Sequence, residues 1–239
     1  MSKKVAIFYH LYQINGWETI YTNHIVKLQK SGLYDAADYI FVNVNGNQKM
    51  PFELSKVHLN RNLQGDYSTE YYALKALYDY SYLNDCKVLF LHSKGVTWSN
   101  TSRFDSYIKV SEDLEFKVGD IYNNVEHWKN YIEHFSVEKW QRCLELLDEY
   151  DTVGTEWIQG GLVRMIKYDI PHYAGGVWWA NSEYVRKLDP NFITNNMILS
   201  RFASEFWIGT KNPNYYNFYT CNRNLYLSPI LPEEYEHIN

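Results

Sequence analysis

Residues 87–95 read KVLFLHSKG, and this stretch decides the fold class. Lys87 to Leu91 form a short, almost uninterrupted apolar run, which is typical of a strand buried on both faces in a parallel sheet. The run ends abruptly in the polar residues 92–95. Because ligands of open α/β sheets bind beyond the carboxyl ends of the strands, these residues stand where a binding site is expected.

The chain ahead of this strand alternates between strand and helix. Val5 to Tyr9 repeat the buried-strand pattern, and from Trp17 to Leu28 apolar residues recur every three or four positions, with Gly32 placed to end that helix. The other upstream elements are a strand over Tyr39–Asn45, a shorter one over 56–59, and a helix from Ser68 or Thr69 to about Tyr82. This alternation is typical of an α/β fold with a mostly parallel central sheet flanked by helices.

The downstream half continues the pattern less regularly. Residues 97–120 are polar and mixed, which predicts a loop. Further expected elements are helices over 125–134 and 137–150, the second capped by Ser136, strands over 151–154 and 173–181, a helix from Ser182 to Leu188, and a helix over 197–207. No Pro/Gly/Ser-rich linker interrupts the chain, so we expect a single domain over 1–212 with an irregular tail over 213–239 packed on it.

Composition narrows the function classes. The 239 residues are 46% hydrophobic and 21% charged, which indicates a folded globular chain. The net charge of -5 has the wrong sign for neutralising phosphate backbones, so we expect no nucleic-acid partner. Three widely spaced cysteines favour neither a disulfide framework nor a zinc site, and no apolar run is long enough to span a membrane. The expected location is therefore the cytoplasm.

Two segments are candidates for ligand binding, each beside an ordinary alternative. Lys94 next to Gly95 combines a point charge with close backbone approach, which suits a diphosphate, although a solvated lysine in a turn would look the same. Gly175 and Gly176 interrupt an apolar, aromatic strand, which is typical of a bulge or of a place where another group approaches the backbone closely. The aromatic content of 18% suits sugar stacking, but glycines that make room for core tryptophans are an equal reading.

A third candidate lies on the expected last helix, where Arg201 and Glu205 stand four residues apart. A carboxylate with a cationic partner can serve as a general base, whereas an ordinary surface ion pair has the same spacing. The sequence contains no G-x-G-x-x-G, Walker A, G-x-S-x-G, H-E-x-x-H or D-x-D motif. A hydrolase of nucleotide sugars or phosphate esters would need a metal cluster or an activated nucleophile, and the sequence shows neither.

The order of these segments resembles a family of small glycosyltransferase-like proteins of bacteria and large DNA viruses. The most specific stretches are LHSKG at 91–95 and HYAGGVWWANSEYV at 172–185, supported by SGLYD at 31–35, YDTVG at 150–154 and RFASEFWIG at 201–209. The resemblance covers most of residues 5–210. It implies a single Rossmann-like, GT-A-type domain with a nucleotide half over about 1–100 and an acceptor half over about 101–212.

Site residues follow from the same resemblance. It implies that His10 and Tyr12 lie near the nucleotide base or ribose, that His92, Lys94, Gly95 and Arg201 bind the donor diphosphate, that His172, Gly175, Gly176 and Trp178 line the sugar and acceptor site, and that Glu205 is the catalytic base. LHSKG stands where GT-A enzymes usually have D-x-D, the motif that holds a divalent metal. Fixed positive charge from His92 and Lys94 would replace that metal, so dependence on Mn²⁺ or Mg²⁺ is left open.

The function implied is the transfer of a hexosyl or pentosyl group from a nucleotide-diphosphate sugar to a hydroxyl of a glycan acceptor. The product would be a surface, capsular or capsid glycan. The alternative is a non-catalytic sugar- or nucleotide-binding module on the same fold, which the absent D-x-D and the many aromatic residues favour.

Overall fold

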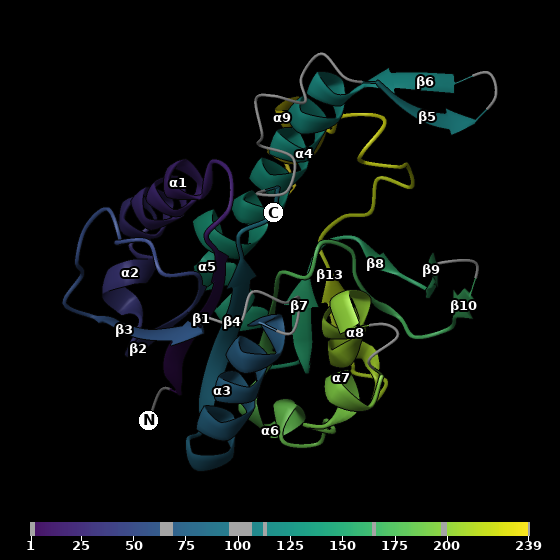
Figure 1. Ribbon diagram of the computed structural model, residues 1–239. Helices are drawn as coiled ribbons and strands as arrows, with labels where there is room; N and C mark the ends of the chain where they lie inside the picture. Colours follow the sequence, from purple (N-terminus) through teal and green to yellow (C-terminus); the bar gives the residue numbers. More distant parts are fainter. Residues whose placement is uncertain are drawn as a thin grey trace.

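A computed structural model describes residues 3–62, 69–95, 107–111, 114–163, 166–196 and 200–238. Its centre is a seven-stranded, mostly parallel sheet in the order β13-β7-β12-β4-β1-β2-β3 (Figure 1). The strands are β1 (Lys4–Tyr12), β2 (Tyr39–Asn45), β3 (Val57–Asn62), β4 (Cys86–His92), β7 (Thr152–Gly154), β12 (Trp178–Asn181) and β13 (Tyr215–Asn217). β12 runs antiparallel to both of its neighbours. The architecture is compatible with a Rossmann-like fold.

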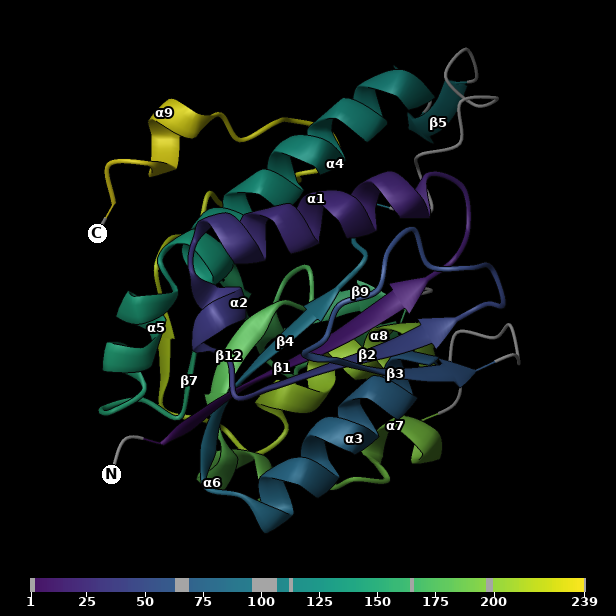
Figure 2. The ribbon, with the colours of Figure 1, turned by 90° about the vertical axis from the view of Figure 1, so that its left-hand side faces the viewer.

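Helices cover both faces of the sheet (Figure 2). One face carries α1 (Trp17–Lys30), α2 (Leu33–Ala36), α4 (Val118–Glu133) and α5 (Trp140–Leu146). The other face carries α3 (Thr69–Leu83), α6 (Ser182–Val185), α7 (Phe192–Asn195) and α8 (Ser200–Phe206). The molecule therefore has three layers with the sheet in the middle.

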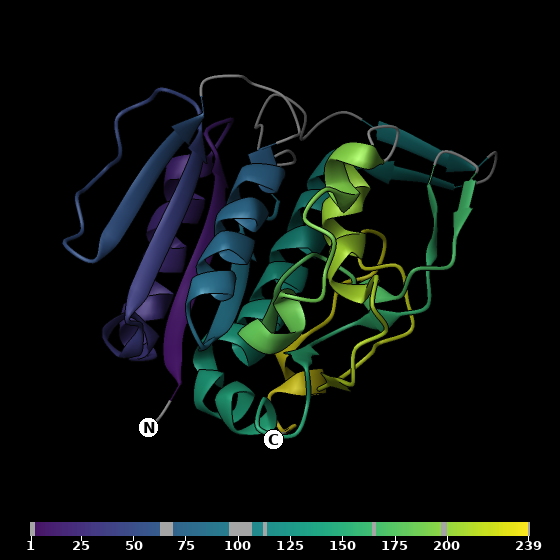
Figure 3. The same ribbon diagram turned by 90° about the horizontal axis from the view of Figure 1, so that it is seen from below.

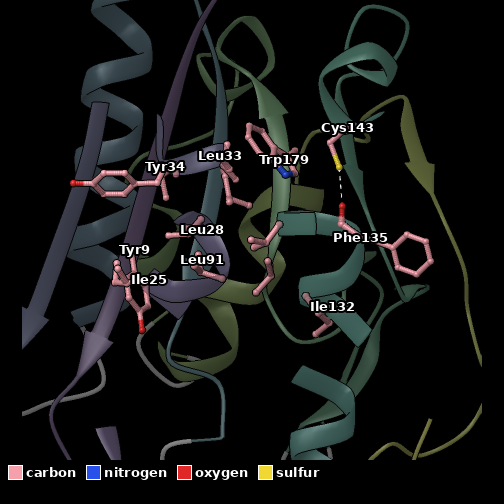
Figure 4. Close-up of a cluster of buried hydrophobic side chains, with 14 of the residues drawn as sticks. Tyr9, Ile25, Leu28, Leu33, Tyr34, Leu91, Ile132, Phe135, Cys143 and Trp179 are labelled. Carbon is pink, nitrogen blue, oxygen red and sulfur yellow. Dashed lines mark hydrogen bonds between the residues drawn. The ribbon is translucent and has the colours of Figure 1, made fainter. Parts of the chain in front are cut away.

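β1 shows why the strands read as continuous apolar runs. Ile7 and Tyr9 belong to the core beneath α1 and α4, whereas Ala6 and Phe8 belong to the core beneath α3. Since alternate side chains of a strand point to opposite faces, a strand covered on both sides must be apolar at every position. Figure 4 shows part of the first core, where Tyr9, Leu91 and Trp179 lie among residues of α1, α4 and α5.

Several expected elements are confirmed. β2 has the expected bounds, and α1, α3 and β4 extend their expected ranges by one or two residues. Gly32 adopts φ +78 just beyond α1, the left-handed conformation that glycine accepts without strain. These elements depend on local patterns that tertiary packing did not override.

The segment between β4 and α4 differs from the expected loop. Residues 107–117 form a hairpin of β5 (Tyr107–Ser111) and β6 (Leu114–Lys117), and α4 begins at Val118. Residues 96–106 and 112–113 lie outside the described residues. The alternation of Ile108, Val110, Leu114 and Phe116 with polar residues was the signal of the hairpin.

Ser136 is not a helix cap. It lies buried in a π-helical segment, His134–Glu138, that joins α4 to α5, and its hydroxyl donates to the carbonyl of Ile132.

The expected strand over 173–181 is also wrong as a single element. β11 (His172–Tyr173) pairs with β8 (Trp157–Ile158), and a turn at Gly175 and Gly176 separates it from β12.

The C-terminal part differs too. α8 ends at Phe206, a 3₁₀ turn covers Trp207–Gly209, and residues 197–199 of the expected helix lie outside the described residues. The tail was expected to be irregular, yet it supplies β13 at one sheet edge and the short helix α9 (Pro232–Tyr235). A further hairpin, β9 (Gly161–Val163) with β10 (Ile166–Tyr168), lies across the molecule from β2 and β3 (Figure 3).

Candidate functional site

Three polypeptide segments meet at the carboxyl edge of the sheet. β1 and β4 are parallel, and the register pairs His10 with His92. β12 runs in the opposite direction, with Trp178 opposite Phe90, so the turn that precedes β12 reaches the same edge. The contact is direct, because Nε2 of His92 lies 2.6 Å from the carbonyl oxygen of Gly175. The structure thus brings two of the sequence-predicted segments together.

His92 is a neutral hydrogen-bond donor. Burial, and after it the nearby charge of Lys94, lowers the pKa of His92 to about 3. A carbonyl oxygen can only accept, so the single proton of the neutral ring is on Nε2. A neutral His92 cannot supply the fixed positive charge expected from the sequence, and that role falls to Lys94.

Lys94 lies on the α4 side of the turn at Gly175 and Gly176, which is called here the glycine turn. Its Nζ is 3.4 Å from the ring centroid of Trp128, close enough for a cation–π interaction. A Cβ added at Gly175 would lie 3.3 Å from the same Nζ, so the turn and the ammonium group are neighbours. Gly95 follows with φ +87, which permits the tight turn after β4.

A space of about 10 Å³ on this side, called here the lysine pocket, lies between α1, α4 and the end of β4 and holds no more than one water molecule. His24, His92, Lys94, Lys129 and Glu133 form its polar lining. Lys129 lies 2.5 Å from Glu126, and Glu133 lies 2.6 Å from Nε2 of His24. The sequence did not reveal Lys129 and Trp128. Both lie in α4, and the spacing of residues along this helix gives no sign that the helix lies beside β4.

Glu205 lies on the opposite side of the glycine turn. A Cβ added at Gly176 would lie 3.4 Å from Cγ of Glu205 and 3.5 Å from Nε2 of His92. A second space there, called here the carboxylate pocket, has no room for a water molecule and is lined by Glu70, Phe90, His92, Gly176, Ser204 and Glu205. The turn therefore separates a pocket with buried lysines from a pocket with two carboxylates.

Glu70 is a third residue that the sequence did not reveal. One of its carboxylate oxygens accepts a hydrogen bond from the hydroxyl of Ser204, and the other lies 3.8 Å from Nδ1 of His92. An acidic residue in the first turn of a helix is common for reasons of the helix dipole alone. Its position in α3 therefore gave no signal of a site.

A row of polar residues crosses the four strands of the N-terminal half. The register places His92, His10, Asn43 and Asn60 side by side. His10 is buried, burial lowers its pKa to about 3, and its Nδ1 has no hydrogen-bond partner among the described residues. The amide of Asn60 donates to the side-chain oxygen of Asn43 at 2.8 Å. The N-x-N spacing within β2 and within β3 could have indicated this row from the sequence.

Tyr12 and His172 are not among the described residues that line the lysine pocket or the carboxylate pocket. Tyr12 is half-buried, and its backbone N–H donates to the hydroxyl of Ser93. His172 is buried against the ring of Phe206, and burial lowers its pKa while the charge of Glu205 acts in the opposite direction. Arg201 lies in α8, and its side chain is outside the described part of the structure.

Trp178 is a core residue. Its side chain is 0% exposed and packs against Phe90 and Trp207, so its ring is not available to stack on a sugar. The sequence resemblance implied that Trp178 lines the sugar site. The register explains why it does not, because Trp178 is the first residue of β12 and faces the core beneath α3 and α8.

In the described ranges, no group of three or more His, Cys, Asp or Glu side chains could hold a metal ion. No helix in that part of the chain is both long enough and apolar enough to cross a bilayer. The chain matches no protein-family model, and no curated protein sequence matches it significantly.

Proposed function

We propose that this chain is a GT-A-type glycosyltransferase that uses a nucleotide-diphosphate sugar and a glycan acceptor. The observation that carries the proposal is the position of Lys94 and Glu205 on opposite sides of the Gly175–Gly176 turn, at the carboxyl edge of the sheet. Open α/β sheets bind nucleotides at this edge. The seven-stranded, mostly parallel sheet is compatible with the Rossmann-like fold that the proposal requires.

The chemistry is assigned to the residues on the two sides of the turn, because the lysine and carboxylate pockets themselves are too small to hold a substrate. The donor diphosphate lies toward Lys94, whose charge stabilises the negative charge that develops on the leaving group. Glu205 accepts the proton of an acceptor hydroxyl, whose oxygen attacks the anomeric carbon. The bond from that carbon to the diphosphate oxygen breaks, and the nucleoside diphosphate leaves with its electron pair.

In this proposal the base and ribose lie near the polar row, in which His10 is 4% and Asn43 0% exposed while Tyr12 is half-buried. His10 and Asn43 offer imidazole and amide groups beside His92, and Tyr12 ends the same strand. Amide groups hydrogen-bond the edges of nucleobases.

All three cysteines are free thiols, which agrees with the reducing, cytoplasmic location that we propose.

A thermal-shift panel tests donor binding. UDP, GDP, CMP, TDP and their sugar conjugates would each be tested with Mn²⁺ and with EDTA. A hundredfold excess over the dissociation constant should stabilise the native state by about 2.7 kcal/mol. We expect one nucleotide to raise the melting temperature in EDTA, and an absence of any shift would contradict the proposal.

Transfer assays separate an enzyme from a binding module. Glu205→Gln should abolish transfer and leave the nucleotide shift intact, because the amide cannot accept the proton. Glu183→Gln is a matched control, since Glu183 is an exposed glutamate paired with Lys3 at the surface. The second candidate is a non-catalytic nucleotide-binding module, which the neutrality of His92 favours because Lys94 then faces the diphosphate without its help. Binding without turnover in the unsubstituted protein would establish that alternative.

A further inference from the structure

A larger cleft, called here the distal cleft, lies beyond the end of α8. Its volume is about 280 Å³, and it is open to solvent. Sites for small molecules begin at about 300 Å³, so the distal cleft suits a single small ring rather than an extended cofactor. The described residues that line it include none of the site residues predicted from the sequence.

Three segments form the distal cleft: the residues before β11, the residues that lead into α7, and the turn after α8. Hydrogen bonds of 2.8 Å tie them together, because the indole of Trp207 donates to the carbonyl of Asp189 and the hydroxyl of Thr210 donates to the carbonyl of Trp207. Gly209 lies so close to Pro171 that an added Cβ would be 1.6 Å from the Pro171 oxygen. The walls of the cleft are therefore held in place by the fold itself.

One part of the lining is apolar. It consists of Ile170, Pro171 and Phe192. Phe192 is the first residue of α7 and is only half-buried, so its side chain remains accessible from the cleft. An aromatic ring beside a proline offers an apolar surface, on which the C–H face of a pyranose ring can pack.

The rest of the lining is polar and mixed in charge. The carboxylates of Asp169 and Asp189 accept hydrogen bonds, the ammonium group of Lys211 donates them, and the amide of Asn212 does both. Asp189 is held in place, because its Oδ1 accepts from the backbone N–H of Asn191 at 2.8 Å. A hydroxyl both donates and accepts, so adjacent hydroxyls of one sugar ring match this mixture. A phosphate group, in contrast, would face two carboxylates with one lysine to offset them.

The distal cleft and Glu205 lie along the same two segments. Gly209 lies against Pro171 at one end, and Glu205 lies against Gly176 at the other. The chain from 171 to 176 thus runs beside the chain from 209 back to 205. About one helical turn separates Glu205 from Gly209, and such a turn spans about 5–6 Å. This spacing is close to the length of one sugar unit.

We propose that the distal cleft binds a neutral pyranose unit of the acceptor glycan, next to the unit whose hydroxyl Glu205 deprotonates. The assignment to an acceptor rests on the proposed function. The assignment to a sugar does not, because the lining of the distal cleft includes neither Lys94 nor Glu205.

Backbone ¹H–¹⁵N nuclear magnetic resonance tests sugar binding without any activity. Glucose, galactose, mannose, N-acetylglucosamine and glucuronate would each be titrated into the labelled protein. At least one neutral sugar should shift the amide signals of residues 209–212, with a dissociation constant of about 1–10 mM for a ligand of about a dozen non-hydrogen atoms. If no sugar shifts these signals, or if glucuronate alone does so, the proposal is overturned.

Asn212→Gly removes one polar group of the distal cleft. Asn212 has φ +48, which glycine adopts without strain, so the variant loses the amide and keeps the backbone. Sugar binding should weaken about three- to tenfold, the cost of one hydrogen bond. Asn222→Gly is the matched control, since Asn222 has φ +55, is exposed and does not line the cleft, and it should bind as the unsubstituted protein does.

Asp189→Asn is a second variant. Its side-chain oxygen can still accept from the backbone of Asn191, while one carboxylate oxygen becomes an N–H donor. It should weaken binding of the same sugar by at least threefold. Unchanged affinity in both Asn212→Gly and Asp189→Asn would rule out the distal cleft as the sugar site.

Kinetics connect the distal cleft to transfer. Asn212→Gly should raise the KM of a disaccharide acceptor about three- to tenfold and leave the donor KM unchanged, because only the acceptor reaches the cleft. If the protein has no transferase activity but a neutral sugar shifts the signals of residues 209–212, the proposed function fails and the sugar site stands. If transfer occurs and the sugars leave these signals unchanged, the sugar site fails alone.

Discussion

Replacing Glu133 by Gln should remove a large part of the stability of the fold. Glu133 ends α4 with its side chain only 2% exposed, and it lies 2.6 Å from Nε2 of His24 and 2.5 Å from Nζ of Lys27, both in α1. Burial acts to raise the pKa of Glu133, but the charges of His24, Lys27 and Lys129 outweigh it and lower this pKa to about 2. The carboxylate is therefore more stable as an anion in the folded protein than in the unfolded chain.

The size of the effect follows from the lowered pKa. The ordinary value is 4.5. At about 1.36 kcal/mol for each unit of pKa, the folded state gains about 3 kcal/mol from the ionised form. Removal of one partner from a buried ion pair costs about 3–5 kcal/mol, which is of the same size. Glu133→Gln should therefore lose about 3 kcal/mol of unfolding free energy at pH 7, roughly a fifth to three fifths of what a domain of this kind has.

Urea unfolding of both proteins across a range of pH measures this difference. Because the pKa of a carboxyl group is lowered on folding, its stabilisation is complete above about pH 4.5 and is lost as the pH falls toward about 2. The gap between the unsubstituted protein and the variant should close over that interval. Glu138→Gln is the control, since Glu138 is largely exposed and pairs with His134. A loss below about 0.5 kcal/mol for Glu133→Gln, the range of surface substitutions, would refute the reasoning.

Three further predictions concern the site and its support. Gly209→Ala should prevent native folding, because its Cβ would lie 1.6 Å from the carbonyl oxygen of Pro171, and a melting temperature like that of the unsubstituted protein would contradict this. Gly175→Ala should lower the unfolding free energy by about 1–2 kcal/mol because of the positive φ, and by more because of the contact with Ile132 at 2.7 Å. It should also reduce transfer. Normal transfer with normal stability would contradict the role of the turn in the site. Lys94→Met should fold but lose the nucleotide-induced thermal shift, so a retained shift in that variant would exclude Lys94 from the donor site.

The sequence predicted those parts of the fold that depend on local pattern. The run before His92 and the periodicity before Gly32 each depend on neighbouring residues, and both are confirmed. β13 could not be predicted in this way, because three residues of a Tyr/Asn-rich segment become a strand only through pairing with β7. Tertiary pairing of this kind leaves no periodicity in the chain.

The site shows the same division. Lys94 was found because it follows an expected strand, and the glycine turn because two glycines interrupt an apolar stretch; the structure places the two beside each other. Glu70 and Trp128 were missed, because helices bring them to the strand ends from distant positions. Trp178 was assigned to a sugar wall by its neighbours in sequence, whereas its side chain faces the core.

The insertion of β12 between β4 and β7 has a consequence for biosynthesis. β1 to β4 lie side by side in the sheet and can pair once residue 92 has left the ribosome. The free side of β4 has no partner until residues 178–181 are made, so the nascent chain carries an open, apolar sheet edge for that interval. Such edges attract other chains, and proteins generally fold from the N-terminus as they are synthesised. Expression of the N-terminal half alone should therefore give aggregates, and co-expression with a chaperone that shields nascent chains should raise the soluble yield of the whole protein.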